Sequence, residues 1–219
     1  ESQTAEHWRQ ELSQALSMAG GHLSLYQLTI EEGTQYQTLF ERGELTIPDE
    51  DSAAAMYEIT QEMTDKAGLP AYEISNHAKA GDQSRHNLVY WRYGDYAGIG
   101  PGAHGRLTVA GRKVATRMHR APEVWLERVQ QDSHGAHPFE DIDGPMRGRE
   151  MLMMGLRLSE GLRIDDVESE SSVTLDTLID HARATRLVEG GFLEMAGSRI
   201  TATSAGRQRL NGLLKYLLI

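Results

Sequence analysis

The segment HLSLYQLTI, residues 22–30, decides how the first part of the chain is interpreted. It is rich in apolar, aromatic and β-branched residues over a length that suits a strand buried on both faces. A helix capped by Thr4 is predicted before it, and a second helix, opened by Pro48-Asp49, is predicted up to Gly68. A second strand, AYEIS, is predicted at residues 71–75. Helices that alternate with buried strands are typical of βα units in a parallel sheet.

Two such units do not make a stable sheet, because a full barrel of this kind needs eight units and about 250 residues. The chain also begins without Met, directly at a helix cap, as if a strand had preceded it. We therefore predict an α/β fragment, a partial (β/α) barrel with an exposed strand edge beside residues 22–30. Such an edge favours self-association.

The remainder of the chain predicts a second domain. A hairpin is expected to turn near Ala110-Gly111, although alanine suits a left-handed turn position poorly. The polar segment SHGAHPFEDIDGP, residues 133–145, is the best candidate linker because it holds two prolines and two glycines. The predicted domains are thus residues 1–132, which end the barrel, and residues 146–219, a small winged-helix-like α+β domain.

Composition excludes several classes of function. Of the 219 residues 39% are hydrophobic, which can fill an ordinary core, and no apolar run reaches the roughly 18 residues of a membrane span. The N-terminus does not look like a signal peptide, so a cytoplasmic protein is expected. Without any cysteine the chain has no disulfide, thiol nucleophile, thiolate zinc site or thiolate-bound iron–sulfur cluster. The first 143 residues carry the formal charge of −10 and the remainder is neutral, which gives little support for binding polyanions.

The segment SRHNLVYWRYGDYAGIGPGAHGR, residues 84–106, holds most of the candidate site chemistry. GPGAHG, residues 100–105, matches the dinucleotide fingerprint G-x-G-x-x-G, but a predicted hairpin follows where the fingerprint needs a helix. Tight turning of the backbone is therefore the preferred interpretation of these glycines. His86 could be a packed histidine or a haem ligand, with His104 as a rival ligand. Flat walls for a porphyrin are available in Tyr90, Trp91, Tyr93 and Tyr96.

Two further features leave alternatives open. Gln27 and Thr29 are polar positions in the predicted first strand, which ends at Glu31 and Glu32. Catalytic groups lie at that end of parallel barrel strands, but a solvated strand cap fits equally well. In the tail, a predicted helix over residues 175–187 carries two aspartates against two arginines, which argues against a helix that reads DNA. A final helix, AGRQRLNGLLKYLL, is predicted over residues 205–218.

The residues also carry a family resemblance. HLSLYQLTIEEGTQY, PDEDSAAAMYE, AGLPAYEISNHA and above all SRHNLVYWRYGDYAGIGPGAHG resemble the later part of the HemW family of haem chaperones. That family belongs to the radical SAM superfamily and is similar to oxygen-independent coproporphyrinogen III oxidase, HemN, with which it shares a C-terminal domain. HNLVYW matches the H-N-x-x-Y-W signature of the chaperone branch.

The resemblance implies a fold, cofactors and site residues. It implies a radical SAM barrel that binds a [4Fe–4S] cluster and S-adenosylmethionine, and a haem that is handed to an acceptor protein, which stays unidentified. His86 matches the proposed haem-iron ligand within a motif that also includes Asn87, Tyr90 and Trp91, and Gln27 and Thr29 match a strand that walls the cofactor pocket. The cluster motif C-x-x-x-C-x-x-C has no counterpart in this cysteine-free chain. We therefore expect haem binding without independent catalysis; the alternatives are a coproporphyrinogen III oxidase and a nucleic-acid-binding winged-helix protein.

Overall fold

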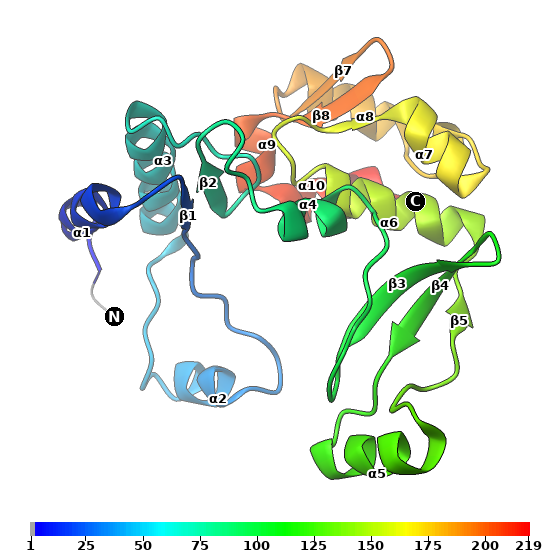
Figure 1. Ribbon diagram of the computed structural model, residues 1–219. Coiled ribbons are helices and arrows are strands. Elements are labelled where there is room, and N and C mark those ends of the chain that lie inside the picture. The colour runs from blue at the N-terminus through cyan, green and yellow to red at the C-terminus, as the bar shows by residue number, and fades with distance from the viewer. Residues whose placement is uncertain (1–2) are drawn as a thin grey trace. The chain divides into compact units, whose positions relative to one another are not determined.

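The computed structural model describes residues 3–219, which form two compact units (Figure 1). The first unit ends at Ser84 and the second runs from Arg85 to Ile219. This division reflects which parts of the backbone pack together. The linker at residues 133–145 was inferred from amino-acid composition and stays a prediction. The first two residues of the predicted domain 1–132 lie outside the described residues. Within residues 3–219, no helix is both long and apolar enough to cross a membrane.

The first unit is built around two helices that pack against each other. Leu12 of α1 is fully buried, and the Trp8 indole Nε1 donates a hydrogen bond of 2.8 Å to Thr60 Oγ1 on α3. Both predicted helix starts are confirmed, because the Thr4 side chain accepts from His7 N and Asp49 accepts from Ser52 N. The elements in order are α1 (Ala5–Met18), β1 (His22–Ser24), α2 (Gln35–Glu41), α3 (Glu50–Lys66) and β2 (Asn76–Ala78).

The two strands predicted in this unit were wrong in extent and direction. β1 covers only three of the nine residues 22–30, and β2 begins one residue after the predicted strand 71–75. The two strands pair antiparallel, with His22 opposite Ala78, instead of side by side in a parallel sheet. A strand needs a neighbouring strand that satisfies its backbone hydrogen bonds. After β1, Leu25 N still donates to Ser75 O, but among the described residues no further backbone hydrogen bond extends the pairing to residues 26–30.

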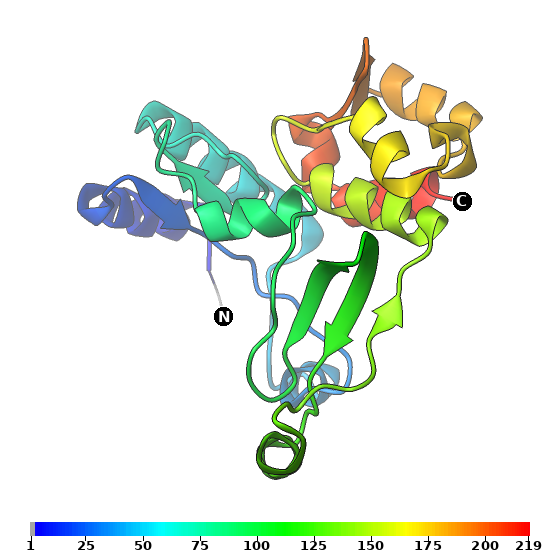
Figure 2. The same ribbon diagram turned by 45° about the vertical axis from the view of Figure 1, so that its right-hand side comes forward.

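The second unit begins with α4 (Arg85–Trp91) and a three-stranded antiparallel sheet in the order β3-β4-β5. β3 (His104–Val109) and β4 (Arg112–Arg117) form the predicted hairpin, and its turn residues Ala110 and Gly111 have φ values of 50° and 76°. Positive φ at both central residues is typical of the two-residue turn whose backbone twist matches that of the two flanking strands. Helix α5 (Pro122–Asp132) lies beyond one end of this sheet (Figures 1 and 2).

The predicted linker, residues 133–145, is bonded to the sheet. Gly135 O accepts from His119 N, and His137 N donates to Arg117 O at 2.8 Å. Further on, β5 (Glu140–Asp141) pairs with β4, placing Glu140 opposite Ala115. The segment's glycines and prolines therefore shape an irregular edge of the sheet.

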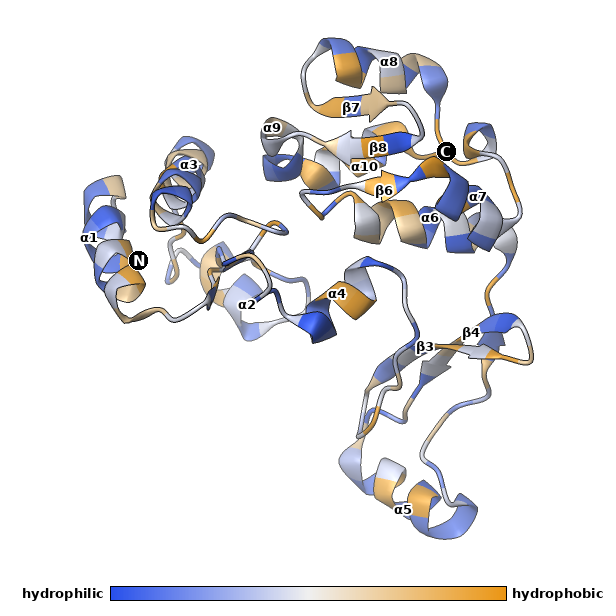
Figure 3. Cartoon of the chain, turned by 45° about the horizontal axis from the view of Figure 1, so that its top comes forward, coloured by the Kyte–Doolittle hydropathy of each residue, from blue (hydrophilic) through white to orange (hydrophobic). Residues whose placement is uncertain are grey.

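The rest of the second unit packs helices around a second antiparallel sheet with the order β6-β8-β7. Its core is aliphatic, with Leu152, Leu178 and Ile200 fully buried, and hydrophobic residues mark α6, α10 and the strands in Figure 3. The elements are α6 (Gly144–Gly155), β6 (Leu162–Arg163), α7 (Ile164–Ser171), the short 3-10 helix η1 (Leu175–Thr177), α8 (His181–Glu189), β7 (Leu193–Ala196), β8 (Arg199–Ala202), α9 (Ser204–Gln208) and α10 (Leu210–Leu217).

Two helices predicted in this region are each divided in the structure. The helix predicted over residues 175–187 is η1 followed by α8, because Asp180 is the N-cap of α8 and accepts from Arg183 N. The final helix is divided between α9 and α10 at Arg209, whose φ is −116°. Both divisions shorten helices that periodicity alone had joined.

Candidate functional site

His86 and Tyr90 lie one helical turn apart on α4 and are bonded to each other. The Nε2 atom of His86 is 2.7 Å from the Tyr90 hydroxyl, and the two rings meet edge to face with centroids 4.6 Å apart. This is the spacing at which side chains i and i+4 meet on a helix. Tyr90 in turn contacts Tyr96 edge to face, with centroids 4.4 Å apart. His86 is exposed, so the arrangement presents an oriented imidazole next to two aromatic rings.

The hydrogen bond between His86 and Tyr90 engages Nε2, so the tautomer of the neutral ring decides whether a nitrogen lone pair is free for a ligand. If His86 Nε2–H donates to Tyr90, the lone pair lies on Nδ1; if Tyr90 donates, Nδ1 carries the hydrogen and Nε2 is released when the hydroxyl turns away. An exposed imidazole with an available lone pair can ligate iron, and the tyrosine fixes the ring's orientation.

Other residues of the predicted haem motif point elsewhere. Trp91 packs under the Arg157 guanidinium, which lies 4.4 Å from the centre of the indole ring, and its buried Nε1 has no hydrogen-bond partner among the described residues. Asn87 is half-buried on the same helix. Tyr93, expected as a porphyrin wall, is buried with φ 58° and donates to Glu150 Oε2 at 2.8 Å. The structure thus brings His86 together with Tyr90 and Tyr96, but not with Trp91 or Tyr93.

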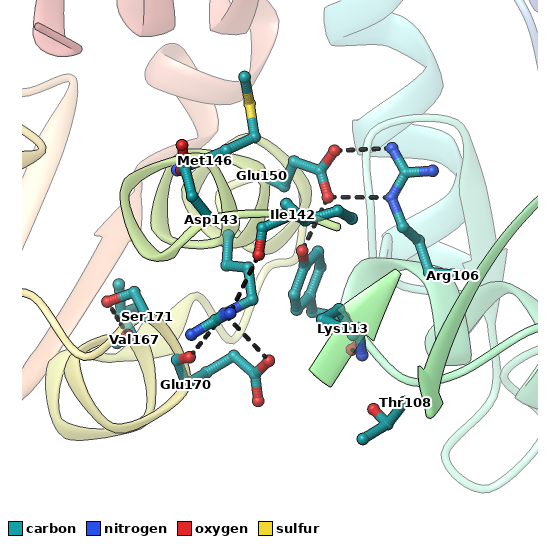
Figure 4. Close-up of polar contacts among 12 residues, drawn as sticks. Arg106, Thr108, Lys113, Ile142, Asp143, Met146, Glu150, Val167, Glu170 and Ser171 are labelled. Atoms are coloured by element: carbon teal, nitrogen blue, oxygen red, sulfur yellow. Dashed lines mark hydrogen bonds and ion pairs between the residues drawn. The ribbon is translucent and has the colours of Figure 1, made fainter. Parts of the chain in front are cut away.

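Glu150 on α6 accepts hydrogen bonds from Arg106 of the hairpin (Figure 4) and from Tyr93, which follows α4. Arg106 on β3 donates from Nη2 to Glu150 Oε1 at 2.6 Å and from Nε to Oε2 at 3.0 Å, a two-pronged contact. Burial alone would raise the pKa of Glu150, but the bonds from Arg106 and Tyr93 outweigh it and lower that pKa. Burial, followed by the bond to Glu150, raises the pKa of Tyr93, so the tyrosine stays a neutral donor.

Lys113 is a second buried charge beside this cluster. Its ammonium donates to Asp95 Oδ1 at 2.8 Å and to Tyr93 O at 3.1 Å. Asp95 also accepts from the backbone and the hydroxyl of Thr108 on β3. Together with Glu150 these bonds hold the segment after α4, which carries Tyr96, against the hairpin. Sequence analysis missed this cluster, because Lys113 stands beside Arg112 in the predicted hairpin and nothing in its spacing marks it as buried.

The glycines of the candidate segment allow close approach of backbones. Tyr96 and Arg106 exchange two backbone hydrogen bonds, and a Cβ on Gly98 would lie 2.3 Å from His104 O. Gly100 and Gly102 have φ values of 104° and 72°, and a strand, β3, follows them. The tight-turn interpretation is confirmed, because the dinucleotide fingerprint needs a helix at this place.

Two histidines beyond β4 form a contact that sequence analysis did not anticipate. His137 is half-buried and stacks on His119 with ring centroids 3.8 Å apart. Burial, followed by the neighbouring His119 and Arg117, lowers the pKa of His137, while Glu140 opposes the shift. His104, considered as a rival haem ligand, is exposed at the start of β3.

Gln27 and Thr29 lie in the first unit, in the wall of a cavity of about 760 Å³. Apolar side chains such as Phe40 and Met56 line much of this cavity. The Gln27 amide donates to Ala53 O on α3 at 2.8 Å, and both candidate residues are exposed. A wall position agrees with the role expected from the resemblance, which stays a prediction.

The model of the HemN C-terminal domain matches residues 142–209. The heme chaperone HemW of Escherichia coli is 32% identical over 217 residues, which are 99% of this chain and 54% of the relative. Radical S-adenosyl methionine domain-containing protein 1, mitochondrial, of Danio rerio is also 32% identical, over 99% of this chain and 50% of the relative.

The resemblance to the C-terminal portion of HemW is confirmed. The HemW-like chain spans about half the length of the curated relatives that it matches. The solved structure of E. coli coproporphyrinogen III oxidase (HemN), a radical SAM enzyme, matches 98% of this chain and 51% of its own length, with a TM-score of 0.72 and 14% identity. This match confirms the expected fold class, a partial radical SAM barrel followed by a small α+β domain.

The radical SAM cofactors do not fit this chain alone. A [4Fe–4S] cluster in this superfamily is held by cysteine thiolates, and none of the 219 residues is a cysteine. The HemW-like chain therefore supplies no cluster ligand of that kind, and no radical step is assigned to its residues.

Proposed function

We propose that this chain is the C-terminal portion of a haem chaperone of the HemW type, and that His86 ligates the haem iron. The observation that carries the proposal is the exposed His86 imidazole, oriented by Tyr90 at 2.7 Å. Relatives over nearly the whole chain carry the name heme chaperone HemW, which supports a haem cargo for this site. Tyr90 and Tyr96 offer aromatic edges to a flat macrocycle.

The remaining motif residues are assigned supporting roles in this proposal. Trp91, packed under Arg157, fixes α4 against the turn that follows α6, and Asn87 lies beside His86 on the same helix. Gln27 and Thr29 are proposed to wall the cofactor pocket of the complete barrel, where S-adenosylmethionine and a cluster would be held together with residues absent from this chain. The acceptor of the haem is proposed to be another protein.

The proposal is tested by titrating haem into the wild-type chain and following the Soret band. A saturable shift at one site is expected, and His86→Ala should weaken binding by about tenfold or more, because an iron–imidazole bond exceeds the 1.4 kcal/mol that a tenfold change represents. His134→Ala is the matched control, since His134 is also exposed. Equal binding by wild type and His86→Ala would overturn the role of His86.

Two alternatives receive less support. The HemN structure is 14% identical, which shows the fold and not the oxidase activity. For nucleic-acid binding, the α8 arginines already have partners within the chain: Arg183 pairs with Asp180, and Arg186 donates to the Tyr216 hydroxyl at 3.2 Å.

Several relatives are named as mitochondrial, so the cytoplasm predicted from the sequence and the mitochondrion are both candidate compartments.

We also propose that the chain self-associates through the segment that follows β1. Tyr26 is 74% exposed and Leu28 is 54% exposed, and among the described residues no backbone hydrogen bond occupies positions 26–30. Unpaired backbone beside exposed apolar side chains favours pairing with another chain. Sedimentation should therefore show a mass that increases with concentration, and a single monomeric species throughout would contradict this.

A further inference from the structure

The stacked histidines His119 and His137 form the strongest cluster of ligating side chains outside the proposed haem site. His119 follows β4, His137 lies in the segment before β5, and the two backbones are joined by hydrogen bonds from His119 N to Gly135 O and from His137 N to Arg117 O. Met118 and Ala136 form an isolated antiparallel bridge between them. The backbone thus holds the two imidazoles together, with centroids 3.8 Å apart.

We propose that His119 and His137 bind a divalent transition-metal ion of the class that prefers imidazole, with Cu²⁺ the tightest and Ni²⁺ and Zn²⁺ weaker. A metal–imidazole bond is about 2.0–2.1 Å long, so two ring nitrogens on one ion lie about 3 Å apart. The ring centroids are 3.8 Å apart and the ring planes are tilted by 34°, so both side chains must turn until their nitrogens face one ion. Water completes the coordination, because within residues 3–219 no group of three or more potential ligands surrounds the pair.

The charges beside the pair tune its affinity for a cation. Arg117 lies opposite His137 across the backbone hydrogen bond and is exposed, so its charge opposes the metal. Glu140 is the carboxylate that acts electrostatically on His137, and its charge favours the metal. Arg117→Ala should therefore tighten binding and Glu140→Gln should weaken it. A purely packing role for the histidines predicts neither change.

Trp125 supplies an optical probe for this site. A Cβ on Gly135 would lie 2.2 Å from Trp125 Cδ1, so the indole packs against Gly135, whose carbonyl oxygen accepts from His119 N. Bound Cu²⁺ should quench the fluorescence of Trp125, and the quenching should be lost in Trp125→Phe. Trp8 and Trp91 remain in that variant and report any ion bound elsewhere.

The test is a titration of the full chain with CuCl₂, followed by fluorescence, with Zn²⁺ as a competitor. Saturable quenching is expected, and His119→Ala and His137→Ala should each weaken it by about tenfold or more, since even indirect supports of a metal ligand are worth that much. His134→Ala and His104→Ala are matched controls that should bind as the wild type does. Unsaturable quenching, or equal binding in the two ligand variants, would overturn the proposal. If either alanine variant fails to fold, Arg117→Ala decides, because unchanged affinity there also contradicts the site.

Discussion

Replacing Glu150 with alanine is expected to lower the free energy of unfolding of the second unit by about 3 kcal/mol, the low end for breaking a buried ion pair. Glu150 and Arg106 are largely buried, with side-chain exposures of 16% and 22%. Without the carboxylate, the Arg106 guanidinium and the Tyr93 hydroxyl lose the acceptor that they share. Urea unfolding, followed by circular dichroism, measures the difference.

Glu160→Ala is the matched control for this prediction. Glu160 also accepts from an arginine, Arg92, at 2.8 Å, but both side chains are about half exposed, and exposed pairs contribute about 0–1 kcal/mol. Similar losses in the two variants would contradict the importance assigned to burial. Because the pKa of Glu150 is lowered in the folded chain, its contribution is fully present above the unfolded-state pKa of a glutamate and is lost as pH falls through the folded-state value.

Gly98→Ala is expected to cost about 3 kcal/mol, the upper part of the usual range for overpacking. The added Cβ would lie 2.3 Å from the backbone oxygen of His104, and backbone cannot move aside as a flexible side chain can. Moving the segment around Gly98 away from β3 would break the pair of backbone hydrogen bonds between Tyr96 and Arg106. Since Tyr96 contacts Tyr90, haem binding should weaken together with stability.

Gly212→Ala tests whether this effect comes from the close contact. Gly212 lies within α10, and a Cβ there meets nothing within 4 Å. Alanine is the better helix former, so this variant should be more stable by about 0.5–1 kcal/mol. A loss in Gly212→Ala as large as in Gly98→Ala would show that the steric argument fails.

Local signals in the sequence predicted the parts of the fold that depend on local chemistry. Thr4 and Asp49 are N-caps as expected, and the hairpin turns at Ala110 and Gly111. The strand at residues 22–30 was predicted too long because a strand depends on partners that composition does not reveal. For the same reason the direction of the pairing between β1 and β2 was wrong.

The candidate site was predictable only in part. The motif HNLVYW singled out His86 and Tyr90, which the structure joins, but it also grouped them with Trp91, which packs under Arg157 instead. A one-dimensional motif does not show which helix face each residue occupies. The Glu150 cluster joins residues from three separated segments, and no spacing rule links positions 93, 106 and 150.

The most direct test of the central claim, that His86 ligates haem iron, is chemical rescue of His86→Gly. Haem is added to this variant and its absorption spectrum is recorded with and without free imidazole, with His134→Gly as the control. The account predicts that the variant lacks the shifted Soret band and that imidazole restores it, because the free base replaces the missing ligand. A shifted band that persists in His86→Gly without imidazole would contradict the account.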